Sequence, residues 1–132
     1  MSVDDRPIVK RRPVYLNLAQ IRLPLPGFIS ILHRISGVAL FLFGIPLLLC
    51  AVQRSLQSPE SFAEIQAIAA HPLAKIILIG FVWAYLHHFC AGIRFLLLDV
   101  HRGIELTAAR RSSVAVLIVS LALTLIIGAR LW

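Results

Sequence analysis

The first long apolar segment of the chain is ISILHRISGVALFLFGIPLLLCAV, residues 29–52. A helix of about 20 apolar residues is long enough to cross a hydrocarbon core about 30 Å thick. The segment shows no sustained alternation of polar and apolar residues, and an open sheet could not satisfy the hydrogen bonds of its edge in lipid. It is therefore predicted to be a transmembrane helix.

Two further segments of the same kind follow, at residues 73–98 and 113–132. The whole chain of 132 residues is 59% hydrophobic and 14% charged, with a mean hydropathy of +0.88, which excludes an ordinary soluble domain. We predict an all-α integral membrane protein with three transmembrane helices, in which residues 1–132 form a single membrane-anchor domain that begins with a cytoplasmic arm at 1–28.

Lysine and arginine are concentrated in the N-terminal arm and in the connection between the second and third spans. Basic residues close to a span are retained on the cytoplasmic side, so the N-terminus is predicted inside and the C-terminus outside. Topology and anionic lipid also account for the net charge of +7, so no nucleic-acid partner is expected. The residues counted are Arg6, Lys10, Arg11, Arg12, Arg22, Arg102, Arg110 and Arg111.

The arm contains no apolar run that could serve as a cleavable signal peptide, so the first span is expected to act as its own insertion signal. The arm also begins with acidic Asp4 and Asp5 and lacks a transit-like prefix. A bacterial inner membrane is therefore favoured, and a mitochondrial inner membrane is the alternative.

The connection after the first span reads Ser58-Pro59-Glu60, which is typical of a helix N-terminus. We expect a short helix on the outer membrane surface that ends at His71; the alternative is a recognition element for a partner.

In the third span, small residues recur every fourth position along one stripe, which should face protein because they allow close helix approach in lipid. These are Ser120, Thr124 and Gly128.

The first span carries Ser30, His33, Arg34 and Gly37 at i, i+3, i+4 and i+7, and therefore on one helical face. A charged side chain at a helix centre costs about 2.5–3.5 kcal/mol on insertion scales. The aligned hydroxyl, imidazole and guanidinium indicate a polar ligand in a protein-lined pocket. The alternative is that Arg34, close to the helix end, snorkels to the interface and only fixes the topology.

In the second span, His88 lies eleven residues before Asp99, about 16 Å along the axis, and so well within the hydrocarbon. It could ligate a haem iron axially, with Gly92 on the same face leaving room for a flat ligand and the other axial ligand coming from a partner. The alternative is a hydrogen bond to a neighbouring helix. His87 points about 100° away from His88 and is the less suitable ligand.

The chain has no C-x-x-C-H, no thiolate cluster and no G-x-G-x-x-G, so covalent haem, iron-sulfur and dinucleotide centres are not expected in it.

The polar motifs of the chain resemble those of the cytochrome b556 subunit family, the first membrane-anchor subunit of succinate dehydrogenase (respiratory complex II). The matching residues are Ser30-x-x-His33-Arg34-x-Ser36-Gly37, His88-x-x-x-Gly92-Ile93-Arg94, Asp99, and the arm at 12–18 and 21–24.

The resemblance implies an anchor subunit of succinate:ubiquinone oxidoreductase within a heteromeric helix bundle. Ser30 and Arg34 would line the ubiquinone site, His88 would be an axial iron ligand of haem b shared with a second anchor subunit, and His33 with Arg34 would lie near the haem propionates. Iron-sulfur and flavoprotein subunits are implied as partners, and no dehydrogenase catalytic residue is expected here. The alternatives are a quinol:fumarate reductase anchor and a structural anchor without a redox role.

One position departs from the family pattern, which usually has a histidine directly after Gly-Ile-Arg, where this chain has Phe95. That histidine is not the axial ligand in the family, so haem ligation by His88 should persist. Any contact that the missing imidazole would make to the propionates is in doubt, and Phe95 could instead pack on the porphyrin.

Overall fold

The structure is a computed structural model that describes residues 22–132, so the predicted arm motif at 12–18 lies outside the described residues. Its helices are α1 (Leu25–Ala39), the π-helical turn η1 (Leu40–Gly44), α2 (Ile45–Ser55), α3 (Pro59–Ala70), α4 (Pro72–Asp99) and α5 (Leu106–Leu131). Three continuous helices are long and apolar enough to cross a membrane, at Leu25–Ser55, Pro72–Asp99 and Leu106–Leu131. The predicted all-α class with three spanning helices is confirmed, while the orientation of the termini stays a prediction.

The first spanning helix changes its winding at η1, directly before Pro46. Proline has no N–H to donate, and its ring crowds the carbonyl four residues earlier, here that of Leu42. A single wider turn accommodates this crowding without breaking the helix. The same residue type is harmless at the start of α1, where Pro26 lies in the first turn and its missing N–H would have no helical partner.

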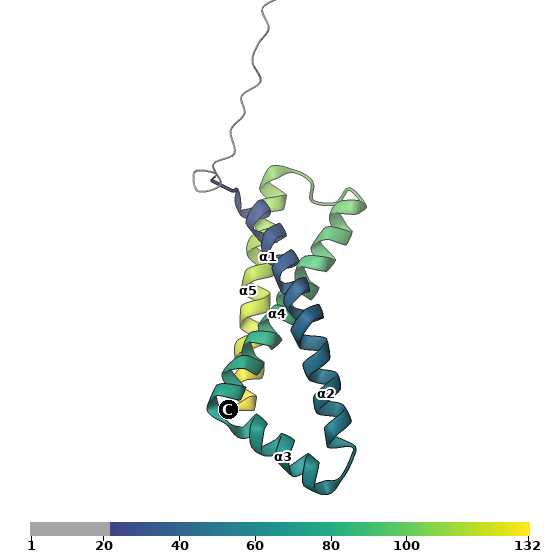
Figure 1. The fold of residues 1–132 in the computed structure, drawn as a ribbon. Coiled ribbons are helices and arrows are strands. Elements are labelled where there is room, and N and C mark those ends of the chain that lie inside the picture. Colours follow the sequence, from purple (N-terminus) through teal and green to yellow (C-terminus); the bar gives the residue numbers. More distant parts are fainter. Residues whose placement is uncertain (1–21) are drawn as a thin grey trace, which may run out of the picture.

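Helix α4 is the centre of the packing, since it contacts both α1 and α5. Figure 1 shows α1 crossing α4 with α5 alongside, whereas α2 diverges from the other two spans and α3 bridges its far end back to α4. The buried core where the three spans meet consists of Ile29, Ala91 and Val116, one residue from each.

The predicted small-residue stripe of the third span faces protein, as expected. Ser120, Thr124 and Gly128 are all buried, and a Cβ on Gly128 would lie 3.5 Å from Ile79 of α4. The hydroxyls return to their own helix, with Ser120 Oγ donating to the Leu117 carbonyl at 3.1 Å and Thr124 Oγ1 to the Ser120 carbonyl at 2.7 Å. The stripe therefore packs closely and leaves no hydroxyl without a partner.

The predicted short helix is α3, and Ser58 is its N-cap. Ser58 Oγ accepts from the Ser61 N–H at 3.2 Å, and Ser61 Oγ accepts from the Ser58 N–H at 3.1 Å, a reciprocal capping box. His71 ends α3 and caps α4, its Nδ1 accepting from the Leu73 N–H at 3.2 Å. The placement of α3 on the membrane surface stays a prediction.

The close contact at Gly128 generates a first test. Gly128→Leu should destabilise the protein by about 1–3 kcal/mol, because the added side chain must push Ile79 and α4 away. Thermal unfolding in detergent, followed by circular dichroism, measures the change. Gly80→Leu is the matched control, since a Cβ there would meet nothing within 4 Å. Equal stability of the two variants would contradict the close packing of α5 on α4.

Candidate functional site

The imidazole of His88 lies between α4 and α1, half-buried and directly against Gly37. A Cβ on Gly37 would lie 2.8 Å from His88 Cε1 and 3.3 Å from Nδ1, closer than real side chains approach one another. Only glycine at this position leaves space for the ring. The first spanning helix therefore provides, at Gly37, the space that the His88 ring of the second occupies, and we call this space the seat of His88.

A hydrogen bond fixes the His88 ring in this seat. His88 Nδ1 is 3.0 Å from the His33 carbonyl oxygen and 3.3 Å from Ser36 Oγ, which itself donates to the same carbonyl at 2.9 Å. Because a carbonyl can only accept, Nδ1 must carry the hydrogen, and the lone pair of the neutral ring is then on Nε2. Metal-ligating histidines usually donate their other ring nitrogen in this way.

The second imidazole of the site, His33, stacks on the first. The ring centroids of His33 and His88 are 4.1 Å apart, and the ring planes differ by 10°. Phe95 lies on the other helix with its centroid 5.2 Å from that of His33, at 53°. The phenylalanine that departs from the family pattern thus contacts His33 of the same site.

Gly92, expected to leave room for a flat ligand, lies next to His33 in space, and its role toward such a ligand stays a prediction. A Cβ on Gly92 would be 3.8 Å from His33 Nε2, and no side-chain atom of His88 lies within 4 Å. Side chains on a helix lean toward its N-terminus, so the His88 ring points away from the residue one turn later. The glycine against the His88 ring is Gly37, from the neighbouring helix.

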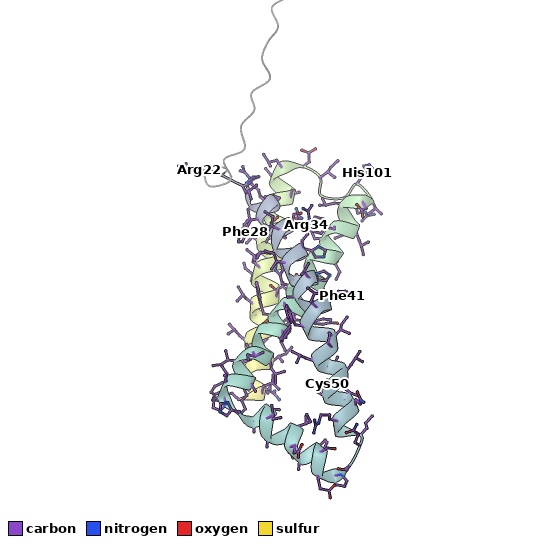
Figure 2. All side chains as sticks on the ribbon, in the orientation of Figure 1. Arg22, Phe28, Arg34, Phe41, Cys50 and His101 are labelled. Atoms are coloured by element: carbon purple, nitrogen blue, oxygen red, sulfur yellow. The ribbon has the colours of Figure 1, made fainter. Side chains whose placement is uncertain are left out.

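The two predicted quinone-site residues stand one turn apart on α1. Ser30 is half-buried, whereas Arg34 is exposed on the surface of the bundle, and Figure 2 shows Arg34 at the same end of the molecule as Arg22. Arg34 is nine residues into α1, about 14 Å along its axis. A guanidinium in this position is accessible to a ligand at the surface of the bundle.

The neighbouring histidine, His87, has a different environment. It is completely buried on the face of α4 that also carries Ala84, Ala91 and Arg94, and its ring centroid is 5.3 Å from that of Trp83. Neither of its ring nitrogens has a hydrogen-bond partner within residues 22–132. His88 Nε2 is not sealed in this manner, so the two adjacent imidazoles have different environments.

Sequence reasoning gave no separate role to Ser36 or Arg94. Ser36 is 4% exposed and bonds both the His33 carbonyl and His88, while Arg94 is 6% exposed and donates through Nε to Ser112 Oγ at 2.9 Å. The signal for Arg94 was the spacing of small and polar residues along α4, which marks the face that packs against other helices. No such periodic signal marks Ser36.

Comparison with known proteins points to one family. Residues 9–127 match the family described as succinate dehydrogenase/fumarate reductase transmembrane subunit. The chain is 38% identical over 119 residues to the succinate dehydrogenase cytochrome b556 subunit of Paracoccus denitrificans, covering 88% of this chain and 91% of that protein. It is also 34% identical to that subunit of Coxiella burnetii, covering 92% and 98%, and 30% identical to that of Rickettsia felis, covering 96% and 98%.

The seat at Gly37 generates a second test. Gly37→Ala should displace the His88 ring and break its bond to the His33 carbonyl, because the new methyl would overlap Cε1. Nitrogen-15 NMR of the histidine-labelled chain in bilayers should show His88 protonated at Nδ1 in the parent and a shifted His88 signal in the variant. Gly44→Ala is the control, since its Cβ would make only ordinary contacts of 3.4 Å or more. An unshifted His88 signal in Gly37→Ala would refute the seat.

Proposed function

Because the chain belongs to the succinate dehydrogenase/fumarate reductase transmembrane subunit family, we propose that it is a membrane anchor of succinate:ubiquinone oxidoreductase in a bacterial inner membrane. In this proposal it binds haem b jointly with a second anchor subunit and forms part of the site where ubiquinone is reduced. The iron-sulfur and flavoprotein subunits would attach on the side of the N-terminal arm. The observation that carries the proposal is the hydrogen bond that orients His88.

The residues around His88 suit an axial ligand of a haem iron. The His33 carbonyl and Ser36 hold the imidazole by Nδ1, and Gly37 allows it to lie close to α1. Nε2 is left with its lone pair and has no hydrogen-bond partner within residues 22–132, as ligation requires. Haem bound there would supply a one-electron carrier within the membrane. His87 is sealed in the bundle, so a second axial ligand would come from the other anchor subunit.

Arg34 and His33 would lie near the haem propionates. They are consecutive residues of α1, so His33 faces α4 while Arg34 faces outward, and the two can border the same ligand from different sides. A carboxylate in a low-dielectric site needs a compensating cation, and the planar guanidinium binds carboxylates with two parallel hydrogen bonds.

Ubiquinone would bind where Ser30 and Arg34 project from α1. Quinone carbonyl oxygens accept hydrogen bonds, and the two electrons taken from succinate add negative charge to these oxygens until two protons arrive. Donors already in position stabilise that charge without having to reorient. Ser30 is the closer of the two to the start of α1, which suits a hydroxyl that passes protons from the aqueous side.

A quinol:fumarate reductase anchor would belong to the same family and would use the same site for the reverse reaction, the oxidation of quinol. The names of the three relatives above favour succinate oxidation. A structural anchor without a redox role would also need hydrogen-bonded histidines, and a visible spectrum separates that alternative from ours.

The ligand assignment predicts the spectrum of the purified complex. It should show a reducible b-type haem, and His88→Ala should abolish that signal because the chain then offers no imidazole at the iron. His87→Gln is the matched control, and it should keep the spectrum because its side chain is buried away from the ligand. A spectrum unchanged by His88→Ala would sink the assignment.

The quinone assignment predicts a split between two activities. Arg34→Leu should reduce succinate:quinone activity about 100-fold, the usual effect of removing one preorganised donor, while succinate oxidation by a water-soluble artificial acceptor continues. Arg54→Leu is the control, because Arg54 lies in the last turn of α2 and pairs with Glu64 at 3.2 Å. Normal quinone reduction in Arg34→Leu would count against the site.

A further inference from the structure

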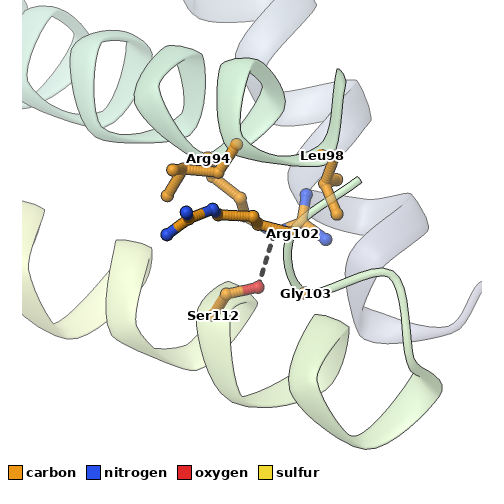
Figure 3. A pocket seen from close by; sticks show the side chains of 6 residues that line it. Arg94, Leu98, Arg102, Gly103 and Ser112 are labelled. Atoms are coloured by element: carbon orange, nitrogen blue, oxygen red, sulfur yellow. Dashed lines mark hydrogen bonds between the residues drawn. The ribbon is translucent and has the colours of Figure 1, made fainter. Parts of the chain in front are cut away.

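A second polar centre lies at the end of α4, away from His88. It is a cavity of about 330 Å³ between the last turn of α4, the following loop and the first turns of α5. Figure 3 shows its lining side chains and the bond from Arg94 to Ser112. The lining residues are Arg94, Leu97, Leu98, Arg102, Gly103 and Ser112, which are two arginines with apolar walls and one hydroxyl.

Arg94 brings a buried positive charge to this cavity. Its guanidinium donates to Ser112 Oγ at 2.9 Å and, more weakly, to the Ala109 carbonyl at 3.4 Å. A guanidinium has five N–H donors, so these bonds leave further donors for a ligand. Within residues 22–132 the one ion pair joins Arg54 and Glu64, far from here, so Arg94 has no carboxylate partner in that part of the chain. A buried cation of this kind calls for an anion.

The backbone at the end of α4 brings the second arginine to the same cavity. The His101 N–H donates to the Leu98 carbonyl and the Arg102 N–H to the Leu97 carbonyl, both at 2.9 Å, which is the Schellman arrangement. It requires a left-handed residue, and His101 has φ +60° although it is not glycine. The chain therefore folds back over the helix end, and Arg102 becomes part of the cavity wall beside Leu97 and Leu98.

We propose that this cavity binds the phosphate of an anionic phospholipid, with Arg94 and Arg102 on the phosphate and the two leucines beside the start of the acyl chains. The arginine guanidinium binds phosphate oxygens with two parallel hydrogen bonds, and basic pockets between spanning helices suit anionic head groups. Arg94 is five residues before the end of α4, about 8 Å along the axis, which is the depth of a lipid head-group boundary.

The depth and the leucine walls favour a lipid over the other sources of an anion. An acidic side chain of a peripheral subunit could reach Arg102, but it would have to carry its backbone below the membrane surface to reach Arg94. Free inorganic phosphate would gain nothing from Leu97 and Leu98. An amphiphile satisfies both the charge and the apolar walls.

The test uses the complex purified with its partner subunits, stripped of lipid by detergent exchange and then mixed with defined lipids. Phosphatidylglycerol should raise the melting temperature by about 3 °C, whereas zwitterionic phosphatidylcholine and inorganic phosphate should not. Arg102→Ala should remove most of this increase. The control is Arg111→Ala, because Arg111 is equally basic and exposed but does not line the cavity.

Native mass spectrometry of the same samples provides the second measurement. Phosphatidylglycerol retained by the complex should fall at least fivefold in Arg102→Ala and stay unchanged in Arg111→Ala. Equal retention and equal stabilisation in the two variants would overturn the site. A similar response to phosphatidylcholine would refute anion recognition, and a full response to inorganic phosphate would refute the lipid as ligand.

Discussion

The hydrogen bond from His88 Nδ1 to the His33 carbonyl is the interaction on which the site depends. Within hydrocarbon a polar group must find its partner inside the protein, and this bond satisfies the imidazole by using the backbone of the neighbouring helix. It is possible only because Gly37 lets the ring approach α1. The same bond selects the tautomer, so helix packing and the chemistry available at Nε2 are determined together.

The sequence predicted the features that depend on local pattern, and these include the three spans, the cap at Ser58 and the stripe at Ser120. It did not predict features that depend on register between helices. The glycine that makes room for the His88 ring, Gly37, comes from another helix and was not assigned to that ring, while the role of Gly92 toward a flat ligand stays a prediction. Hydropathy placed the start of the third helix at residue 113, whereas α5 begins at Leu106. Hydropathy detects only the apolar part of a helix, and the first turns of α5 carry arginines.

The polar side chains of the two centres lie in one half of the bundle. The end where α1, α4 and α5 pack together holds His33, His88 and Arg94, while α2 contacts η1 and α3 and exposes apolar side chains such as Leu48, which is 63% exposed. A face this apolar needs lipid or another membrane subunit to cover it. That requirement agrees with the family, whose relatives are named as subunits of a larger enzyme.

Phe95 connects the two polar centres. Its ring lies 5.2 Å from the His33 ring on one side and 5.4 Å from the Arg94 guanidinium carbon on the other. A histidine at this position could form hydrogen bonds with both neighbours, whereas phenylalanine offers only its ring edge and π-face. In this chain the histidine stack and the buried arginine are therefore coupled by packing alone, and each must obtain its polar partners elsewhere: His88 from the His33 carbonyl and Arg94 from Ser112.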